Sequence, residues 1–224
     1  MMTAVSGADM AFARSLFTRG TDMFGAEEIG AVCGLDVSVP PQPFTEADLV
    51  LARQRDEMLV YQLDGITMKR IHEMRDNKTS DGKPLFYNTD WYRGEEFFTN
   101  DPLRTGWRLV SRAPITTARD KNYLEQTEVL VRELQAIYGT EMPESVRQAI
   151  EEFESRKSEL AKLLSYDWKE AAKQLTGLAV NVEFREKPVE ALWSLALYEG
   201  VNRERLLPPG SWSWTNALSS DGDV

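Results

Sequence analysis

The chain has 224 residues, of which 42% are hydrophobic, 28% charged and 10% aromatic, and its formal net charge is −10. This is the composition of an ordinary globular protein, and it excludes disordered, collagenous and coiled-coil classes. The negative charge disfavours nucleic acids and anionic membranes as partners, because Lys and Arg supply most of the affinity for a phosphate backbone. The length suits one large domain or two small ones.

A single cysteine, Cys33, and a single histidine, His72, limit the chemistry of the chain. No internal disulfide, thiolate cluster or His-rich zinc site can be built, so we expect no metal and a reducing compartment, the cytoplasm. The sequence lacks a Walker A loop and a strand that leads into Gly-x-Gly-x-x-Gly, so we expect no cofactor. Its first residues lack the basic and apolar regions typical of a signal peptide, so we expect none. No apolar stretch comes close to the ~20 residues that span a bilayer.

Residues 1–43 are predicted to form an N-terminal helical arm followed by a proline-rich linker. Residues 26–33 are typical of a short amphipathic helix, and Gly34 suits its C-terminal end. Three prolines within residues 40–43 remove amide donors and favour an extended chain. We therefore expect a domain boundary at residue 43 and one α+β domain over residues 44–224.

The first half of this domain alternates predicted helices and strands. Thr45 is a typical N-cap for a helix that runs to about Arg55. Residues 58–63 are rich in β-branched and aromatic side chains and predict a strand, as do residues 106–111. A short helix is expected around residues 67–74. The stretch between this short helix and the strand at residues 106–111 has no clear periodicity.

The second half is dominated by a predicted long helical pair. Apolar residues at spacings of three and four predict a helix over residues 120–138, and Pro143 opens a second helix to about Leu164. Asp167 resembles the start of a capping box for a third helix. Residues 178–185 alternate between apolar and polar positions, which predicts a strand.

Two further elements close the predicted domain. Pro188 opens a helix that we expect to end at Gly200. Residues 211–216 alternate like a strand, with Trp212 and Trp214 on one face, and residues 219–222 are a turn signal. The fold class is therefore a mainly helical α+β fold. It has a small, largely antiparallel sheet of strands near residues 58, 107, 180 and 212.

The turn at residues 219–222 is followed by only two residues in this sequence, so the predicted hairpin is incomplete. An aromatic strand without a partner leaves amides, carbonyls and ring faces uncovered. We expect either that the natural protein is longer, or that a protein partner or a second copy supplies the missing strand by strand addition. The simpler alternative is that the strand at residues 211–216 pairs with an internal strand of this chain and the tail beyond it frays.

An acidic and aromatic segment over residues 90–107 is the main candidate site. Its catalytic candidates are the carboxylates Asp90, Glu95 and Glu96. The binding candidates, in this segment and at the C-terminus, are Trp91, Tyr92, Trp107, Trp212 and Trp214. Paired carboxylates beside aromatic rings are typical of sugar-cleaving sites, and Trp and Tyr are favoured interface anchors. The simpler alternative is that the rings fix a long loop to the core while the acids are solvated.

Several segments resemble known bacterial sequences. TDWYRGEEFF at 89–98, GWRLVSR at 106–112 and NYLEQT at 122–127 resemble segments of uncharacterised bacterial proteins, a resemblance that implies no activity. GSWSWTN at 210–216, with SSDG at 219–222, is similar to the opening of the C-terminal β segment in bacterial C-type-lectin-like and formylglycine-generating-enzyme-like proteins. In that resemblance, ligand-binding residues lie beyond this motif.

The leading interpretation is a non-enzymatic recognition or assembly module. The alternative is a carboxylate-dependent glycan hydrolase that uses Asp90, Glu95 and Glu96. Two carboxyl groups about 5 to 10 Å apart across an open cleft would favour the hydrolase.

Overall fold

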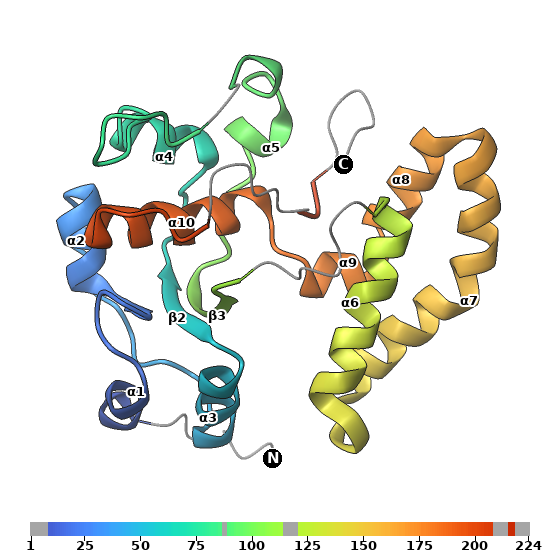
Figure 1. Ribbon diagram of the computed structural model, residues 1–224, viewed down its shortest axis with the longest axis horizontal. Coiled ribbons are helices and arrows are strands. Elements are labelled where there is room, and N and C mark those ends of the chain that lie inside the picture. The colour runs from blue at the N-terminus through green and yellow to red at the C-terminus, as the bar shows by residue number, and fades with distance from the viewer. Residues whose placement is uncertain (1–8, 87–88, 114–120, 208–214, 218–224) are drawn as a thin grey trace. The chain divides into compact units, whose positions relative to one another are not determined.

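The computed structural model describes residues 9–86, 89–113, 121–207 and 215–217 (Figure 1). The chain forms two compact units. Unit 1 takes its described residues from 1–94, 98–114 and 189–211, and unit 2 takes them from 95–97, 115–188 and 212–224. Helices predominate over a small sheet, which confirms the predicted mainly helical α+β class.

Unit 1 contains the sheet and most of the short helices. Its main elements are α1 (Met10–Leu16), β1 (Met23–Phe24), α2 (Ala26–Cys33), α3 (Glu46–Gln54), β2 (Glu57–Gln62), α4 (Met68–Met74), the 3-10 turn η1 (Thr89–Trp91), β3 (Gly106–Ser111) and α10 (Pro188–Asn202). Helix α5 (Glu96–Thr99) contributes Phe98 and Thr99 to this unit. The predicted helix ends at Thr45 and Gly34 are confirmed, because Thr45 accepts the amide of Asp48 and Gly34 adopts a left-handed conformation.

The sheet is mixed rather than wholly antiparallel. Strand β2 lies in the centre, pairs antiparallel with β3 from Glu57↔Ser111 to Gln62↔Gly106, and pairs parallel with β1 over two residues. Most of β2 is buried. The strands predicted near residues 58 and 107 are therefore confirmed. Strand β1 was not predicted, because two residues are too few to show the alternating pattern of a strand. Residue 212 lies outside the described residues.

The segment before residue 43 belongs to the body of unit 1. It supplies α1, β1 and α2, and the indole Nε1 of Trp107 donates a hydrogen bond of 2.8 Å to the carbonyl of Pro40. Trp107 is buried and meets Tyr61 edge-on, with ring centroids 5.4 Å apart. The proline-rich stretch is thus fixed to β3 through a buried tryptophan, and the boundary of the compact units does not fall at residue 43.

Helix α10 supplies a large share of the core of unit 1. Trp193 is almost fully buried, and its Nε1 donates to the carbonyl of Tyr61 at 2.8 Å. The prediction that Gly200 ends this helix is wrong, because α10 continues to Asn202. A Cβ at Gly200 would lie 2.7 Å from the methyl groups of Val32, so glycine is needed there for close packing against α2.

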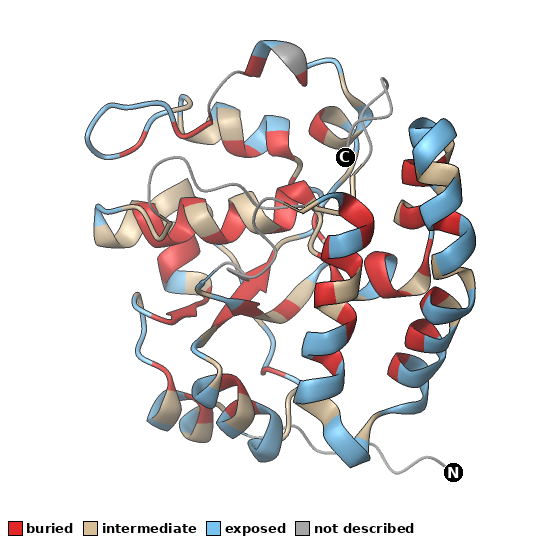
Figure 2. Ribbon diagram, turned by 45° about the vertical axis from the view of Figure 1, so that its right-hand side comes forward, coloured by how far each residue is buried: buried red, intermediate tan, exposed pale blue. Residues whose placement is uncertain are grey.

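Unit 2 is a helical unit with its own core. Its elements are α6 (Tyr123–Tyr138), the 3-10 turn η3 (Gly139–Glu141), α7 (Glu144–Tyr166), α8 (Trp168–Thr176) and α9 (Ala179–Phe184). Figure 2 shows buried and exposed residues interspersed along α7, as expected of a helix with one buried face. Phe153, Leu160 and Leu175 are fully buried in this core. The long helices predicted over 120–138 and from Pro143 are confirmed.

The strand predicted over residues 178–185 is wrong, because this stretch forms α9. Its first amide, that of Ala179, donates to Glu152 Oε2 of α7 at 2.9 Å, a favourable place for a carboxylate. The side chain of Asn181 donates to the carbonyl of Leu175 at 2.8 Å. The bond to Glu152, which is distant in the sequence, and the bond to nearby Leu175 stabilise a short helix whose own apolar pattern resembles that of a strand.

Candidate functional site

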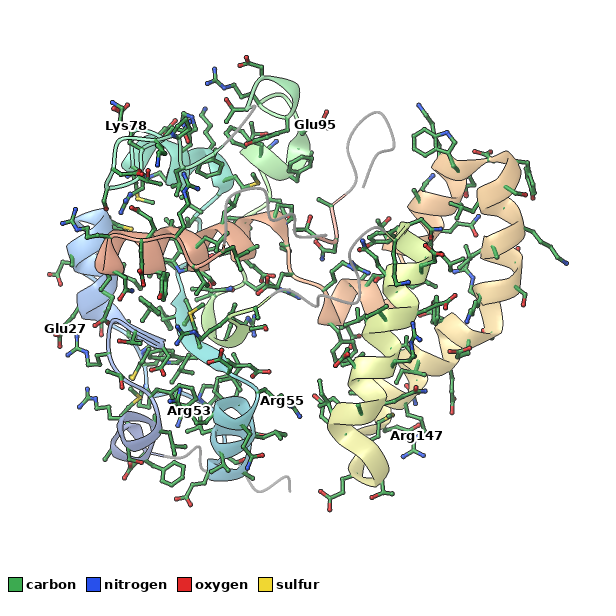
Figure 3. The ribbon with its side chains drawn as sticks, in the orientation of Figure 1. Glu27, Arg53, Arg55, Lys78, Glu95 and Arg147 are labelled. Atoms are coloured by element: carbon green, nitrogen blue, oxygen red, sulfur yellow. The ribbon has the colours of Figure 1, made fainter. Side chains whose placement is uncertain are left out.

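The three predicted catalytic carboxylates lie at surface positions. Asp90 is exposed in η1, and Glu96 is exposed at the start of α5. Glu95, which is labelled in Figure 3, is half-buried just before Glu96. Their side chains come from two short helical segments and the turn between them. Whether any two of them act together stays a prediction.

The predicted aromatic candidates divide between two sets of neighbours. Tyr92 is buried against Phe98, with ring centroids 5.6 Å apart, and burial raises the pKa of Tyr92 to about 12. Phe98 also contacts Phe86, whereas Trp107 packs on Tyr61. Tyr92 and Trp107 therefore serve packing in this structure. The side chains of Trp91, Trp212 and Trp214 lie outside the described residues.

The C-terminal stretch touches the segment between α9 and α10 at one described point. The amide of Asn216 donates to the carbonyl of Glu186 at 3.0 Å. Both residues belong to unit 2. Strand addition through this end of the chain stays a prediction.

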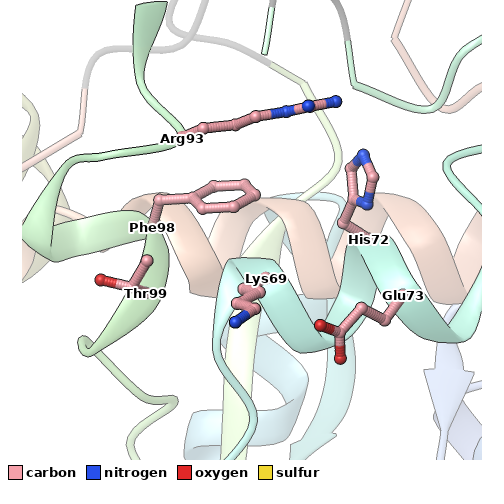
Figure 4. Close-up of a pocket in the computed structure, with 6 residues that line it drawn as sticks. All are labelled: Lys69, His72, Glu73, Arg93, Phe98 and Thr99. Atoms are coloured by element: carbon pink, nitrogen blue, oxygen red, sulfur yellow. The ribbon is translucent and has the colours of Figure 1, made fainter. Parts of the chain in front are cut away.

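A small cavity of about 250 Å³ lies between α4 and α5. Helix α4 presents one face to it through residues spaced three and four apart, which is the spacing of one helix face. The described lining residues are Lys69, His72, Glu73, Arg93, Phe98 and Thr99 (Figure 4). All six belong to unit 1.

The charges of this cavity are mainly positive. Arg93 and Lys69 contribute two cations, while Glu73 contributes one carboxylate that already lies 3.8 Å from the guanidinium of Arg70. The Nε of Arg93 donates to Thr89 Oγ1 at 3.1 Å, which fixes the base of the guanidinium. Of the six described lining residues, one carries a carboxylate, whereas glycoside hydrolysis usually needs two.

His72 forms the side wall of the cavity. Its imidazole lies 5.7 Å from the ring of Phe86 and 6.2 Å from that of Phe98, measured between centroids. The Nε2 atom is buried and has no hydrogen-bond partner within the described part of the chain. The structure thus shows the single histidine of the chain partly enclosed by aromatic rings.

A second candidate surface is the corner between α7 and α8. Tyr166, the last residue of α7, is 77% exposed, and Trp168, the first residue of α8, is 46% exposed. Asp167 between them caps α8 by accepting the amide of Glu170 at 3.2 Å. The ammonium of Lys169 lies 5.4 Å from the centre of the Trp168 ring. We call Tyr166, Trp168 and Lys169 the aromatic corner.

Neither surface was recognised as a site from the sequence. The cavity combines side chains from α4, the residue after η1 and α5, so no local motif contains it. The aromatic corner consists of two adjacent helix ends, where Tyr and Trp are usually packing residues. The one available signal was the capping residue Asp167, which marks a sharp change of direction between two aromatic residues.

Comparisons with known proteins give no further guidance. The chain matches no protein-family model, and no curated protein or solved structure is significantly similar to it. Among the described residues, no group of three or more His, Cys, Asp or Glu side chains is placed to hold a metal ion. The helices within this part of the chain are all too short or too polar to cross a membrane.

Proposed function

We propose that the protein is a non-enzymatic recognition module that binds a protein partner through the aromatic corner of unit 2. The observation that carries this proposal is the exposure of two large aromatic side chains, Tyr166 and Trp168, at one helix junction. Tyr and Trp dominate binding energy in protein interfaces, because each offers a large contact area with few rotatable bonds. Neither ring contributes its full area to the core.

The aromatic corner is held by a rigid base. Leu160 of α7 and Leu175 of α8, the two helices that meet at the corner, are fully buried in the core of unit 2. Farther along the two helices, Arg156 Nη2 donates to Gln174 Oε1 at 2.7 Å. Fixed helix ends lower the ordering cost of binding, which is the reason that preorganised surfaces bind more tightly.

The composition supports a protein partner in a reducing compartment. A net charge of −10 disfavours nucleic acid as the partner. The single Cys33 excludes an internal disulfide, which supports a cytoplasmic location as part of the same proposal.

The test is site-specific photo-crosslinking in cells with p-benzoylphenylalanine at position 168. We expect a discrete crosslinked partner whose purified form binds the protein. The double substitution Tyr166→Ser and Trp168→Ser should weaken that binding at least tenfold, because truncating an interface anchor typically costs about 2 kcal/mol or more. Affinity is measured by calorimetry on the purified pair.

The matched control places the photo-crosslinker at position 50 and substitutes Val50→Ser. Val50 is 39% exposed on α3 of unit 1, so it tests a hydrophobic surface residue outside the corner. Equal crosslinking at positions 50 and 168, or unchanged affinity in the double variant, would refute the proposal. Unfolding by urea should be nearly the same for the double variant and the natural sequence, because both rings are exposed.

A further inference from the structure

The cavity between α4 and α5 is positively charged in a protein that is strongly negative. Two of its lining residues, Lys69 and Arg93, are exposed cations. After the bond of Arg93 Nε to Thr89, the two terminal nitrogens of the guanidinium have no acceptor in the part of the chain that the structure describes. Lys69 has no carboxylate partner in that part either. An anion at this position would therefore meet unused donors.

The buried nitrogen of His72 adds a second, independent feature. A buried polar atom without a partner carries the full cost of its desolvation, so such atoms are rare unless a ligand or water completes them. The Nε2 atom of His72 is in this state within the described part of the chain, and His72 is one of the residues that line the cavity. Figure 4 shows the Arg93 side chain stretched above Phe98, with its guanidinium on the side of His72.

The cavity also has an apolar surface and a small volume. Phe98 is buried and presents its ring between Arg93 and Lys69 in the view of Figure 4. The volume of about 250 Å³ lies below the range of roughly 300 to 1,000 Å³ that holds drug-sized molecules. A ligand that fits is therefore small and combines a negative group with a short apolar part.

We infer that this cavity binds a small carboxylate, with one carboxylate oxygen on the Arg93 guanidinium and the other facing His72 Nε2. A carboxylate is planar and offers two acceptor oxygens, which match the planar fork of a guanidinium. The apolar part of the ligand lies against Phe98, and Lys69 adds a second positive charge. This site is in unit 1 and does not depend on the aromatic corner in unit 2.

The chain's single histidine makes the test direct, because the imidazole signals of a tag-free, isotope-labelled protein belong to His72 alone. We would titrate the protein with isobutyrate and follow these signals by NMR. We expect saturable shifts with a dissociation constant on the order of 1 mM, as befits a ligand of a few atoms. Isobutyramide, which has the same shape without the charge, should give no saturable shift.

Arg93→Gln should weaken isobutyrate binding about tenfold, because a hydrogen bond between two charged groups is lost. The matched control is Lys162→Gln, which makes the same change of charge on an exposed residue of α7 and should leave binding unchanged. The inference is overturned if isobutyrate gives no saturable shift, if isobutyramide binds equally well, or if Arg93→Gln has no effect. Equal affinity for inorganic phosphate would overturn the assignment to a carboxylate.

Discussion

The two units bury charged groups in opposite ways. In unit 1 the buried charges are carboxylates, and each has an arginine beside it. The pairs are Glu199 with Arg75 at 2.5 Å, Glu190 with Arg104 at 2.6 Å, Asp22 with Arg53 at 2.8 Å, and Glu28 with Arg19 at 2.9 Å. Glu199 also accepts the amide of Ser80 at 2.6 Å. The negative charges of this core are thus paired and hydrogen-bonded, the condition under which buried charges are tolerated.

Unit 2 buries a cation instead, and its partners are neutral. Arg185 is 8% exposed, and its Nε donates to Asn181 Oδ1 at 3.0 Å. Its terminal nitrogens make longer bonds of 3.4 Å to Gln126 and 3.5 Å to Thr127. The guanidinium also lies 4.4 Å from the centre of the Tyr123 ring. Burial lowers the pKa of Arg185 and raises that of Tyr123 to about 12.

The difference concerns what remains when an arginine is removed. In unit 1 the loss of an arginine leaves a carboxylate buried without its counter-charge. In unit 2 the loss of Arg185 removes the charge itself and leaves polar groups that still bond one another, since the amide of Asn181 donates to Thr127 Oγ1 at 3.2 Å. Removing a buried carboxylate's arginine in unit 1 should therefore lower the free energy of unfolding far more than removing Arg185 in unit 2.

The largest effect is expected for Arg75→Met. This change leaves Glu199 buried and unpaired, and it should lower the free energy of unfolding by about 3 to 5 kcal/mol. Adding Glu199→Gln should restore much of the loss, because glutamine is uncharged and its oxygen still accepts the amide of Ser80. Urea denaturation of the single and double variants measures both values. Equal losses in the two variants would show that packing rather than charge sets the cost.

A smaller effect is expected for Arg185→Met. The variant loses hydrogen bonds to neutral acceptors and a cation–ring contact. These losses are partly offset, because the free-energy cost of burying a charged guanidinium is also removed. We expect a loss of about 1 kcal/mol, the usual value of one net hydrogen bond. The same urea series decides the result. A loss as large as that of Arg75→Met would break the comparison between the units.

The smallest effect concerns Cys33, which lies in the electrostatic field of Arg75 and Arg70. Burial raises the pKa of Cys33 to about 11, against the lowering effect of these two arginines. Since the thiolate is the reactive form, alkylation by iodoacetamide at pH 7.5 should be at least tenfold slower than in urea-unfolded protein. Both rates follow from mass spectrometry of quenched samples. A rate close to that of the unfolded chain would show that the thiol is accessible and that the arginines outweigh burial.

Local signals in the sequence determined many of the helices and two of the three strands. Thr45 and Asp167 act as caps through their own neighbours, so their helices could be predicted from a few consecutive residues. The helix within residues 178–185 could not be predicted in this way, because Glu152 and Leu175, which hydrogen-bond to it, lie outside the stretch itself. The prediction that Gly200 ends its helix was wrong for a similar reason. The glycine is needed for close packing against Val32, which is far away in the sequence.

The candidate surfaces were less predictable than the fold. Acidic residues such as Asp90 and Glu96 are conspicuous in a sequence, yet the structure places both at exposed positions in short helical segments. The cavity forms because Arg93, His72 and Phe98 line the same space. Predicting it requires knowledge of the path that the chain takes between α4 and α5. A single histidine on a short helix offers no sequence pattern that would place it in one cavity with an arginine of another segment.

The order of segments in unit 1 also affects how the protein is synthesised. Residues 115–188 of unit 2 lie between β3 and α10 in the sequence, while α10 supplies Trp193, Glu190 and Glu199 to unit 1. A nascent chain that has emerged only as far as residue 188 holds helices α6 to α9 of unit 2 but lacks Trp193, whose Nε1 donates to the carbonyl of Tyr61 in β2. Because long-range contacts form late, the ribosome presents an unfinished unit 1 throughout the synthesis of unit 2.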